Sequence, residues 1–316
     1  MDVLAESLRT LQMKTEVYGR LELSAPWGIK LDLSHPGYFH AVSRGSCWLE
    51  IEGKRIALAA GDWVFILGGS SHVLRDSPKT RSRPLPEIYA THGGRCGGIL
   101  RYGGQGTQTT LISFSFGFRG TWLNPVLAAL PRVLHVKGDG FVATRWVESV
   151  VQLVAAEMEA GRPAHEIVVT RLADVLFVHA LRAHIQALPT EEGGWLRALE
   201  DPQLGLVLQQ LHERPSYPWT VKAMAKVASM SRSMFAARFQ RIIGESPLTY
   251  LTRWRMHSAI QMMAESNESL VSIAGAVGYE TDGAFGKTFK RYVGSTPGTY
   301  RRQLREKSES AKGRSK

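Results

Sequence analysis

The chain is poor in cysteine: its 316 residues contain only Cys47 and Cys96. Two thiols are too few for a disulfide scaffold or for a zinc site built from several cysteines. The sequence also lacks a run of about 18 apolar residues that could span a bilayer, and a charged start followed by an apolar signal segment. These absences predict a soluble, cytoplasmic protein with no membrane partner.

Acidic residues are scarce in the last third of the chain. The whole chain carries 39 Lys and Arg against 28 Asp and Glu, a net charge of +11. Residues 201–316 hold 18 and 9 of these, a net of +9, which leaves +2 for residues 1–200. A basic surface confined to one region is what binding to a phosphate backbone requires. The alternative is a basic surface without a nucleic-acid partner.

The same segment occurs twice in that basic region, fifty residues apart. Seven residues recur: Phe235, Phe239, Arg241, Gly244, Pro247, Thr249 and Tyr250 return as Phe285, Phe289, Arg291, Gly294, Pro297, Thr299 and Tyr300. The pattern predicts a short helix, a tight turn, a second helix with two phenylalanines, and a Gly-x-x-Pro stop. One such helix-turn-helix unit can lay a helix in the major groove of DNA. Two in tandem predict a chain that reads two successive grooves.

In the first unit, Thr220 and Ser231 are the expected N-caps of two helices, over residues 221–228 and up to about Ile243. Phe235 and Phe239 should be buried, because they are spaced at i and i+4. The opposite face and its flanks form the expected DNA surface, which comprises Arg232, Ser233, Ala236, Ala237, Arg238, Gln240 and Arg241. The two alanines offer only methyl contacts to bases, and we expect the three arginines to contact phosphates.

In the second unit, the corresponding helix is expected from about Asp282 to Val293. Its outer face comprises Asp282, Gly283, Gly286, Lys287, Lys290 and Arg291. The two glycines present no side chain to a base, so we expect this unit to grip phosphates more than it reads sequence. A continuous helix over residues 249–264 should join the two units and set their spacing.

Residues 202–305 resemble the DNA-binding domain of the AraC/XylS family of bacterial transcription regulators. The resemblance rests on the repeated pattern, in particular on Ile273-Ala274, Gly278-Tyr279, Phe289-Lys290-Arg291, Gly294-x-x-Pro297 and Tyr300-Arg301. It implies two helix-turn-helices joined by a linker helix, with the first usually dominating base reading. It also implies double-stranded promoter DNA and RNA polymerase as partners, activation as the commoner outcome, and a homodimer.

Residues 15–120 are rich in glycine, aromatic residues and short apolar runs, a pattern typical of an all-β sandwich or barrel. The clearest strands are expected at 47–51, 62–67 and 111–116. The spacing from Gly61 to His72 resembles the second motif of cupins, with Leu67 in place of the usual proline. Further short matches at 1–4, 25–28, 44–49, 60–62 and 129–131 resemble one cupin-bearing branch of the same regulators, so the resemblance covers nearly the whole chain.

Histidines are sparse where a catalytic cupin holds its metal. His40 is the one histidine near the first motif, no His-x-His occurs, and His72 stands alone in the second. Three protein ligands with an open position are hard to assemble from this set. We therefore expect His72 to be a hydrogen-bonded barrel residue, and predict no metal, no cofactor and no enzymatic activity. The alternative is a metal-dependent cupin enzyme with a DNA-binding appendage.

Two kinds of signal remain open for the barrel. Cys47 is in phase with Leu49 and should point inward, whereas Cys96 lies beside Arg95, and a positive neighbour favours the reactive thiolate. The pair could sense an oxidant, or could be a buried small hydrophobe and an ordinary loop thiol. A small molecule bound near Trp48 and Trp63 is the other possibility.

The predicted fold class is α+β and multidomain. We expect a cupin-like β-barrel sensor at residues 1–135, a helical hairpin and linker for dimerisation and transmission at 136–195, an all-α double helix-turn-helix domain at 196–306, and a disordered tail at 307–316. The predicted function is a sequence-specific, DNA-binding transcription regulator, an activator, that senses a small molecule or an oxidant. Two further hypotheses are a redox-inert, small-molecule-responsive repressor and a nucleoid-type binder without sequence preference.

Overall fold

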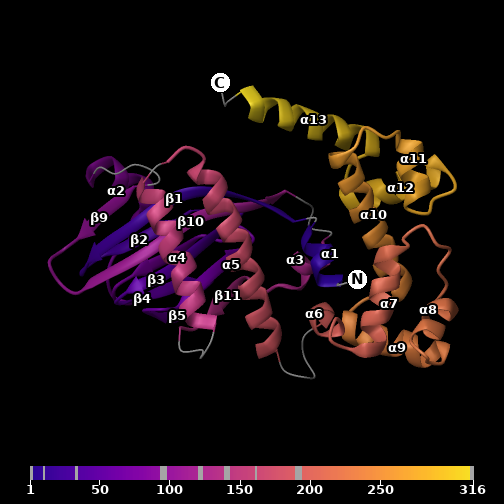
Figure 1. Cartoon of the computed structure of the whole chain (residues 1–316), viewed down its shortest axis with the longest axis horizontal. Coiled ribbons are helices and arrows are strands. Elements are labelled where there is room, and N and C mark those ends of the chain that lie inside the picture. The colour runs from indigo at the N-terminus through magenta and orange to yellow at the C-terminus, as the bar shows by residue number, and fades with distance from the viewer. Residues whose placement is uncertain are drawn as a thin grey trace. The chain divides into compact units, whose positions relative to one another are not determined.

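The computed structural model describes residues 3–9, 11–32, 35–92, 98–119, 124–138, 143–160, 162–188 and 194–313. The chain forms two compact units, whose elements are labelled in Figure 1. The β unit comprises Met13–Arg119 and Leu130–Ala187. The helical unit comprises Met1–Gln12, Gly120–Ala129 and Leu188–Lys316.

The β unit contains two sheets. The six-stranded sheet has the order β11-β6-β3-β10-β1-β9, with β11 (Val133–Val136), β6 (Trp63–Leu67), β3 (Gly37–Arg44), β10 (Gln108–Arg119), β1 (Gln12–Ser24) and β9 (Ile99–Gly103). The five-stranded sheet has the order β5-β4-β7-β2-β8, with β5 (Lys54–Ala59), β4 (Ser46–Ile51), β7 (His72–Arg75), β2 (Gly28–Leu31) and β8 (Arg83–Pro84). The strands predicted at 47–51 and 111–116 are confirmed as parts of β4 and β10, and the strand predicted at 62–67 is confirmed as β6, which begins one residue later.

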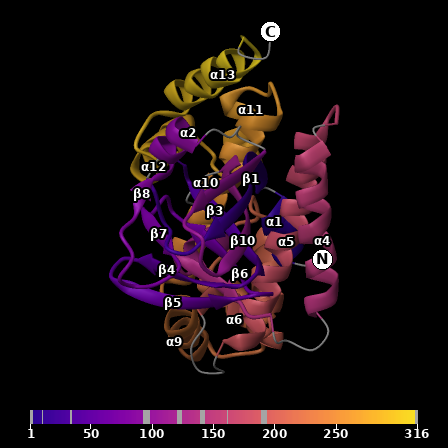
Figure 2. The same ribbon diagram turned by 90° about the vertical axis from the view of Figure 1, so that its left-hand side faces the viewer.

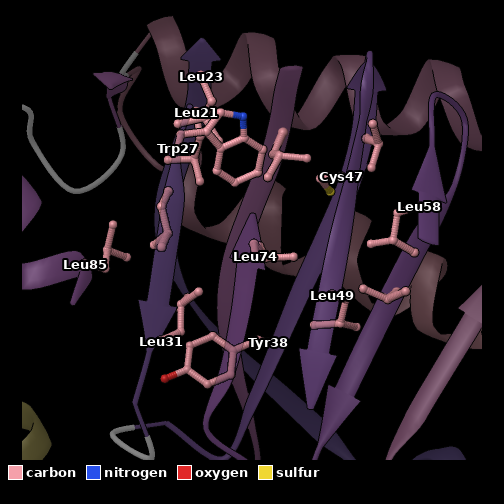
Figure 3. Packing of buried hydrophobic residues seen from close by; sticks show 14 of the residues in the cluster. Leu21, Leu23, Trp27, Leu31, Tyr38, Cys47, Leu49, Leu58, Leu74 and Leu85 are labelled. Atoms are coloured by element: carbon pink, nitrogen blue, oxygen red, sulfur yellow. The ribbon is translucent and has the colours of Figure 1, made fainter. Parts of the chain in front are cut away.

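Apolar side chains fill the space between the two sheets (Figure 3). Along β4, residues alternate between buried and partly exposed, so that Cys47, Leu49 and Ile51 all point into this core, as predicted for Cys47. Leu74 of β7 lies near the middle of the cluster in Figure 3, with Trp27 above it and Tyr38 below it. The interior of the barrel is therefore a packed core.

The outer face of the six-stranded sheet is covered by a helical hairpin, α4 (Ala143–Ala160) and α5 (His165–Ala187). Figure 2 shows the three layers in order: the strands β4, β5 and β7, then β3, β6 and β10, then the hairpin. The ring of Phe177 from α5 lies 5.4 Å from that of Phe65 and 5.0 Å from that of Phe118, centre to centre. Every residue of β6 is buried, because both of its faces are covered.

The hairpin therefore belongs to the β unit, which differs from the separate segment 136–195 expected from the sequence. The reason is that the apolar stripe of α5 is matched by phenylalanines on the outer face of the sheet. Those residues appear in the sequence only as ordinary alternating strand positions.

The helical unit contains α6 (Gly194–Ala198), α7 (Pro202–Glu213), α8 (Val221–Val227), α9 (Arg232–Ile243), α10 (Pro247–Glu265), α11 (Leu270–Ala276), α12 (Asp282–Val293) and α13 (Pro297–Gly313). The predicted N-caps are confirmed: the Thr220 hydroxyl accepts a hydrogen bond from the Ala223 backbone N–H, and the Ser231 hydroxyl from that of Met234. The continuous connecting helix is confirmed as α10.

Two short helices from the first half of the chain also belong to this unit: α1 (Val3–Arg9) and α3 (Pro125–Ala129). The Asn124 side-chain amide donates to the Ser7 carbonyl at 2.8 Å, and Val126 is fully buried. The boundary expected at residue 135 therefore differs from the structural division. Buried contacts, and not position in the sequence, place these segments.

The last helix also differs from expectation, since α13 continues to Gly313 where a disordered tail was predicted from residue 307. Leu304 packs against the core of the second helix-turn-helix. Beyond it the sequence contains mostly good helix formers, such as lysine, glutamate and alanine. In the described ranges, no helix has both the length and the apolar content needed to cross a membrane.

Candidate nucleic-acid interface

The two helix-turn-helix units are built alike. The helices α9 and α12 start at hydroxyl N-caps, Ser231 and Thr281, and end at glycines with left-handed backbones, Gly244 (φ 87°) and Gly294 (φ 85°). Such a glycine ends a helix without the steric clash that a Cβ would cause. Both helices therefore have sharply defined ends, and both are 12 residues long.

Burial confirms that the repeat is structural. Over residues 231–248 and 281–298 the sequence of buried, intermediate and exposed positions is identical in the two copies. Phe235 and Phe239 are fully buried in one copy, as are Phe285 and Phe289 in the other. Each second helix therefore buries the same side and exposes the same side.

The turns differ by one residue. The buried positions Met224 and Ala225 of α8 correspond to Ile273 and Ala274 of α11, an offset of 49 and not 50. The second unit has one more residue in its turn. Its turn runs four residues from the C-cap Val277 to the N-cap Thr281, whereas the turn of the first unit runs three residues from the C-cap Ala228 to the N-cap Ser231. The two units are thus not strict duplicates at the point that sets the angle between their helices.

The exposed surface of α9 is mixed in character. Arg232, Ser233, Ala237, Gln240 and Arg241 are exposed and Ala236 is half-buried. Among the described residues, neither Arg232 nor Arg241 takes part in an ion pair, so both are available to phosphates. Gln240 uses its side-chain amide to donate to the Gly244 carbonyl at 2.9 Å.

Met234 belongs to this surface, although the sequence did not mark it. Its side chain is 53% exposed in the first turn of α9, the end that commonly meets base edges. An apolar residue next to Phe235 is easily taken for core. Its helical spacing to Ala237 and Arg241, at i+3 and i+7, is the signal that would have placed it on the outer face.

Arg238 has a different environment from the other arginines of α9. Its guanidinium pairs with the Asp201 carboxylate at 2.5 Å and donates to the Gln203 side chain at 2.8 Å. The phosphate contact expected for Arg238 competes with these partners.

The surface of α12 presents two lysines and two glycines where that of α9 presents a mixture of side chains. Lys287, Lys290 and Arg291 are exposed, and Arg291 lies over the ring of Tyr292 at 5.1 Å. Asp282 lies in the first turn, where a carboxylate interacts favourably with the helix dipole. A Cβ added at Gly283 or Gly286 would meet open space. Packing within the chain therefore does not require either glycine.

Among the candidate sensor residues, Cys47 is buried and its environment opposes ionisation. Burial, and secondarily the Asp62 carboxylate, raise the pKa of its thiol to about 12. A thiol in this state is a poor nucleophile. Cys96 lies outside the described residues.

His72 is held in a buried chain of hydrogen bonds. Its Nδ1 lies 3.2 Å from the Ser70 carbonyl and must donate to it, so its Nε2 is left as an acceptor. The His40 Nε2–H then donates to that atom at 2.8 Å, and the His40 Nδ1 accepts from the Ser113 hydroxyl at 2.8 Å. Burial lowers the pKa of His72 to about 4 and that of His40 well below its usual range.

The described parts of the chain hold no group of three or more His, Cys, Asp or Glu side chains suited to a metal ion. Trp63 is buried, with its ring centre 6.1 Å from those of Phe39 and Phe65, and is part of the core. Trp48 is half-buried on the outer face of β4. The candidate residues are therefore not gathered around one empty cavity.

A groove of about 810 Å³ lies elsewhere in the β unit, between the β1, β9 and β10 end of the six-stranded sheet and α4. Its charged lining comprises Arg20, Glu22, Arg44, Arg101 and Glu159. The Arg20 guanidinium pairs with both Glu22 and Glu159 at 3.2 Å, which ties β1 to α4 across the groove. Arg44 is exposed there and takes part in no ion pair with a described residue.

Both units of the chain match known protein families. The family description "Cupin" matches residues 2–186, and "Helix-turn-helix domain" matches residues 224–303. A putative AraC-like transcription regulator of Streptomyces lividans is 37% identical over 309 residues, which cover 96% of this chain and 98% of the relative. The HTH-type transcriptional regulator AlkR of Acinetobacter baylyi is 28% identical over 306 residues, covering 96% of this chain and 100% of AlkR.

Shorter matches also occur. The RCS-specific HTH-type transcriptional activator RclR of Escherichia coli is 34% identical over 181 residues, which cover 57% of this chain and 63% of RclR. Among solved structures, the DNA-binding domain of AdpA, a global transcriptional factor in complex with a target DNA, is 30% identical. That match covers 34% of this chain and 95% of AdpA's domain, with a TM-score of 0.32.

Proposed function

This chain belongs to the family of AraC-like transcription regulators, and from that premise we propose how its two units divide the work. The protein is a DNA-binding transcription regulator with a cupin-like unit in front of a double helix-turn-helix. It acts on promoter DNA in the bacterial cytoplasm, by sequence-specific binding through α9 and phosphate binding through α12.

The observation that carries this proposal is the contrast between two helices with the same burial pattern. The outer face of α9 presents side chains of several kinds, including the exposed Met234 and Ser233, which can distinguish base edges. The corresponding face of α12 presents glycines and lysines, which supply charge but little base discrimination. Selectivity therefore comes mainly from the first unit, whereas the second contributes mainly electrostatic affinity.

The cupin-like unit supplies the signal, and we favour a small molecule over an oxidant acting at Cys47. The pKa of about 12 makes the Cys47 thiol unreactive, and the barrel interior is filled by side chains. The groove beside α4 is open, and Arg44 in it suits an anionic ligand. A ligand that displaces Glu159 from Arg20 would break the ion pair between α4 and β1. The ligand-bound and ligand-free states would then differ in this contact, as a ligand-driven change of state requires.

The protein works as a homodimer that contacts RNA polymerase and activates transcription. Apolar side chains on the outer side of the hairpin support a second copy as the partner: Leu153, Ile167, Val168 and Val175 are all exposed. Activation accords with the name of RclR, a transcriptional activator that is similar over part of the chain.

Binding to DNA is tested with the chain's own upstream region. We expect the purified protein to bind one segment of it with at least about a thousandfold preference over a shuffled duplex, at matched salt. Equal affinity for both duplexes at every salt concentration would support a nucleoid-type binder instead.

The signal is tested in the same assay. Hypochlorite is added to wild type and to a Cys96→Ser variant. A change in DNA affinity in wild type that is absent from the variant would show an oxidant response through Cys96. Adding citrate, a small anionic probe, to wild type and to Arg44→Ala tests the groove. We expect citrate to raise the thermal midpoint of wild type but not of the variant; an equal shift in both contradicts a site at Arg44.

A further inference from the structure

One arginine of α9, Arg238, is bound by other side chains of the protein. Arg238 has a 33% exposed side chain, and both of its terminal nitrogens are engaged: Nη2 pairs with Asp201 Oδ2 at 2.5 Å, and Nη1 donates to Gln203 Oε1 at 2.8 Å. We name Asp201, Gln203 and Arg238 the Arg238 node. A two-pronged contact of this kind fixes direction as well as distance.

The partners of Arg238 are themselves fixed. Asp201 is the N-cap of α7: its Oδ1 accepts from the backbone N–H groups of Gln203 at 3.0 Å and Leu204 at 2.9 Å. The Gln203 side chain donates to the carbonyl of Ala228, the C-cap of α8, at 3.0 Å. The node therefore joins α7, α8 and α9 through polar contacts with preferred geometry.

The Arg238 node restricts the rotation of α9 about its own axis, which apolar packing alone restricts only weakly. Phe235 and Phe239 hold α9 in the core, but phenylalanine contacts have no strong directional preference. Arg238 lies on the flank of the helix, one turn beyond Met234 and adjacent to Ala237. Holding its guanidinium resists rotation of α9 about its own axis, and such rotation would move the reading face relative to base edges.

The second unit lacks this arrangement. Thr288 stands at the position equivalent to Arg238 and shares a hydrogen bond with the Tyr279 hydroxyl. Across the described residues of α12, no ion pair ties the helix to its neighbours. The chain thus locks the orientation of the helix with the varied reading face and leaves the lysine-bearing helix without such a lock.

We infer that Arg238 is a positioning residue that sets the sequence selectivity of α9 through Asp201 and Gln203, and not a phosphate contact. This inference rests on the proposed function, because selectivity has meaning only if the chain prefers a site. It reverses the role expected for Arg238 from the sequence. Releasing Arg238 to a phosphate would leave the partly buried Asp201 carboxylate without its cation.

The two roles predict opposite effects for one substitution. Asp201→Asn keeps an N-capping oxygen but removes the negative charge. If Arg238 contacts phosphate, the variant frees it and removes a repelling charge, so binding to any duplex tightens. If Arg238 positions α9, the variant loses preference for the specific site.

The test measures affinity by fluorescence anisotropy for the specific site and for a shuffled duplex, over a series of salt concentrations. We expect Asp201→Asn and Arg238→Met each to lower the ratio of specific to shuffled affinity about tenfold. The double variant should lose no more than either single one, because both break the same contact. The slope of log affinity against log salt should stay unchanged, since no phosphate contact is lost.

Two further variants serve as controls. Arg241→Gln removes an exposed arginine of the same helix, and we expect it to reduce the salt slope by about 0.9 while leaving the specificity ratio unchanged. Arg238→Lys keeps the charge but not the two-pronged geometry, so it should retain the salt slope and still lose selectivity. Urea unfolding of each variant confirms that the helical unit is folded.

The positioning role is contradicted if Asp201→Asn tightens binding to both duplexes, or if Arg238→Met reduces the salt slope as Arg241→Gln does. Because Asp201→Asn alone separates the two roles, the test stands even if Arg238→Met fails to fold. A wild-type chain that does not distinguish the two duplexes contradicts the proposed function, and the inference falls with it. A wild-type chain that does distinguish them, with an unchanged ratio in Asp201→Asn, contradicts the inference alone.

Discussion

Single residues of the β unit are defined by where the fold buries them. Cys47 lies in the core beside Leu49, and burial raises the pKa of its thiol to about 12. His40 and His72 lie between the two sheets and are neutral, because burial lowers the pKa of both. Each of these states can be measured directly.

The Cys47 thiol should not react with thiol reagents in the folded protein. In a Cys96→Ser variant, Cys47 is the remaining thiol, and at pH 8 a pKa of about 12 leaves about one thiolate in 10⁴. We expect Ellman's reagent to label no thiol in the native variant and one thiol after unfolding in guanidinium chloride. Rapid labelling before unfolding would show that Cys47 is accessible and would reopen it as an oxidant sensor.

The His40–His72 pair should make stability fall with acid. The folded pKa of His72 is about 4 and the unfolded value about 6.5, so the unfolded chain binds a proton that the folded chain refuses. The resulting stability is fully present above pH 6.5 and is lost as pH falls toward 4, by about 3 kcal/mol for a shift of this size.

Urea unfolding at pH 7, 6 and 5, followed by tryptophan fluorescence, measures this loss. His72→Gln keeps a donor for the Ser70 carbonyl and removes the titrating ring, so its stability should depend less on pH. A variant whose pH dependence equals that of wild type would assign the titration to other groups.

At the scale of elements, α9 and α12 share one local design but present different outer faces. Both α9 and α12 have a hydroxyl N-cap, two buried phenylalanines and a left-handed glycine at the end. Their outer faces differ: Ala237 and Gln240 in α9 correspond to Lys287 and Lys290 in α12. The buried phenylalanines are the same in the two copies, whereas several exposed positions differ.

Lys287→Ala should weaken binding to all DNA alike. Lys287 is exposed and carries one positive charge, next to Gly283 and Gly286 on the outer face of α12. We expect the affinity for specific and shuffled duplexes to fall by the same factor, and the salt slope to drop by about 0.9. Competition against a panel of single-base variants of the site checks this. A changed preference at one base pair would show that α12 reads sequence.

At the scale of the whole molecule, the helical hairpin has one side packed on the sheet and another side open to a partner. Its inner side covers the six-stranded sheet through residues such as Phe177, whereas its outer side exposes apolar side chains. A second copy of the chain would cover that outer side.

Ile167→Glu should therefore shift the oligomeric state. The Ile167 side chain is 63% exposed on α5, so a charge there does not disturb the fold but opposes an apolar interface. We expect sedimentation velocity to show dimers for wild type and monomers for the variant at micromolar concentration. Gln186→Glu adds the same charge to an exposed position in the last turn of α5 and should leave the dimer intact. Equal sedimentation of Ile167→Glu and wild type would place any dimer interface elsewhere.

Much of the helical unit follows from local sequence. The N-caps at Thr220 and Ser231, the start of α12 at Asp282 and the buried phenylalanines were all predictable, because helix periodicity and capping depend on residues within one or two turns. The alternation that turns Cys47 inward is equally local. Family membership also lies in the sequence, since the repeated motif and the cupin motif can be read directly.

Tertiary structure alone decided which distant residues meet. Arg238 pairs with Asp201, 37 residues away, and becomes part of the scaffold where the sequence indicates an open, DNA-facing arginine. His40 and His72 meet across the barrel because β3 and β7 lie in facing sheets, and α1 and α3 join the helical unit through buried contacts. Such pairings depend on strand register and on the packing of whole elements. Those arise only when the chain is folded and leave no short-range pattern in the order of the residues.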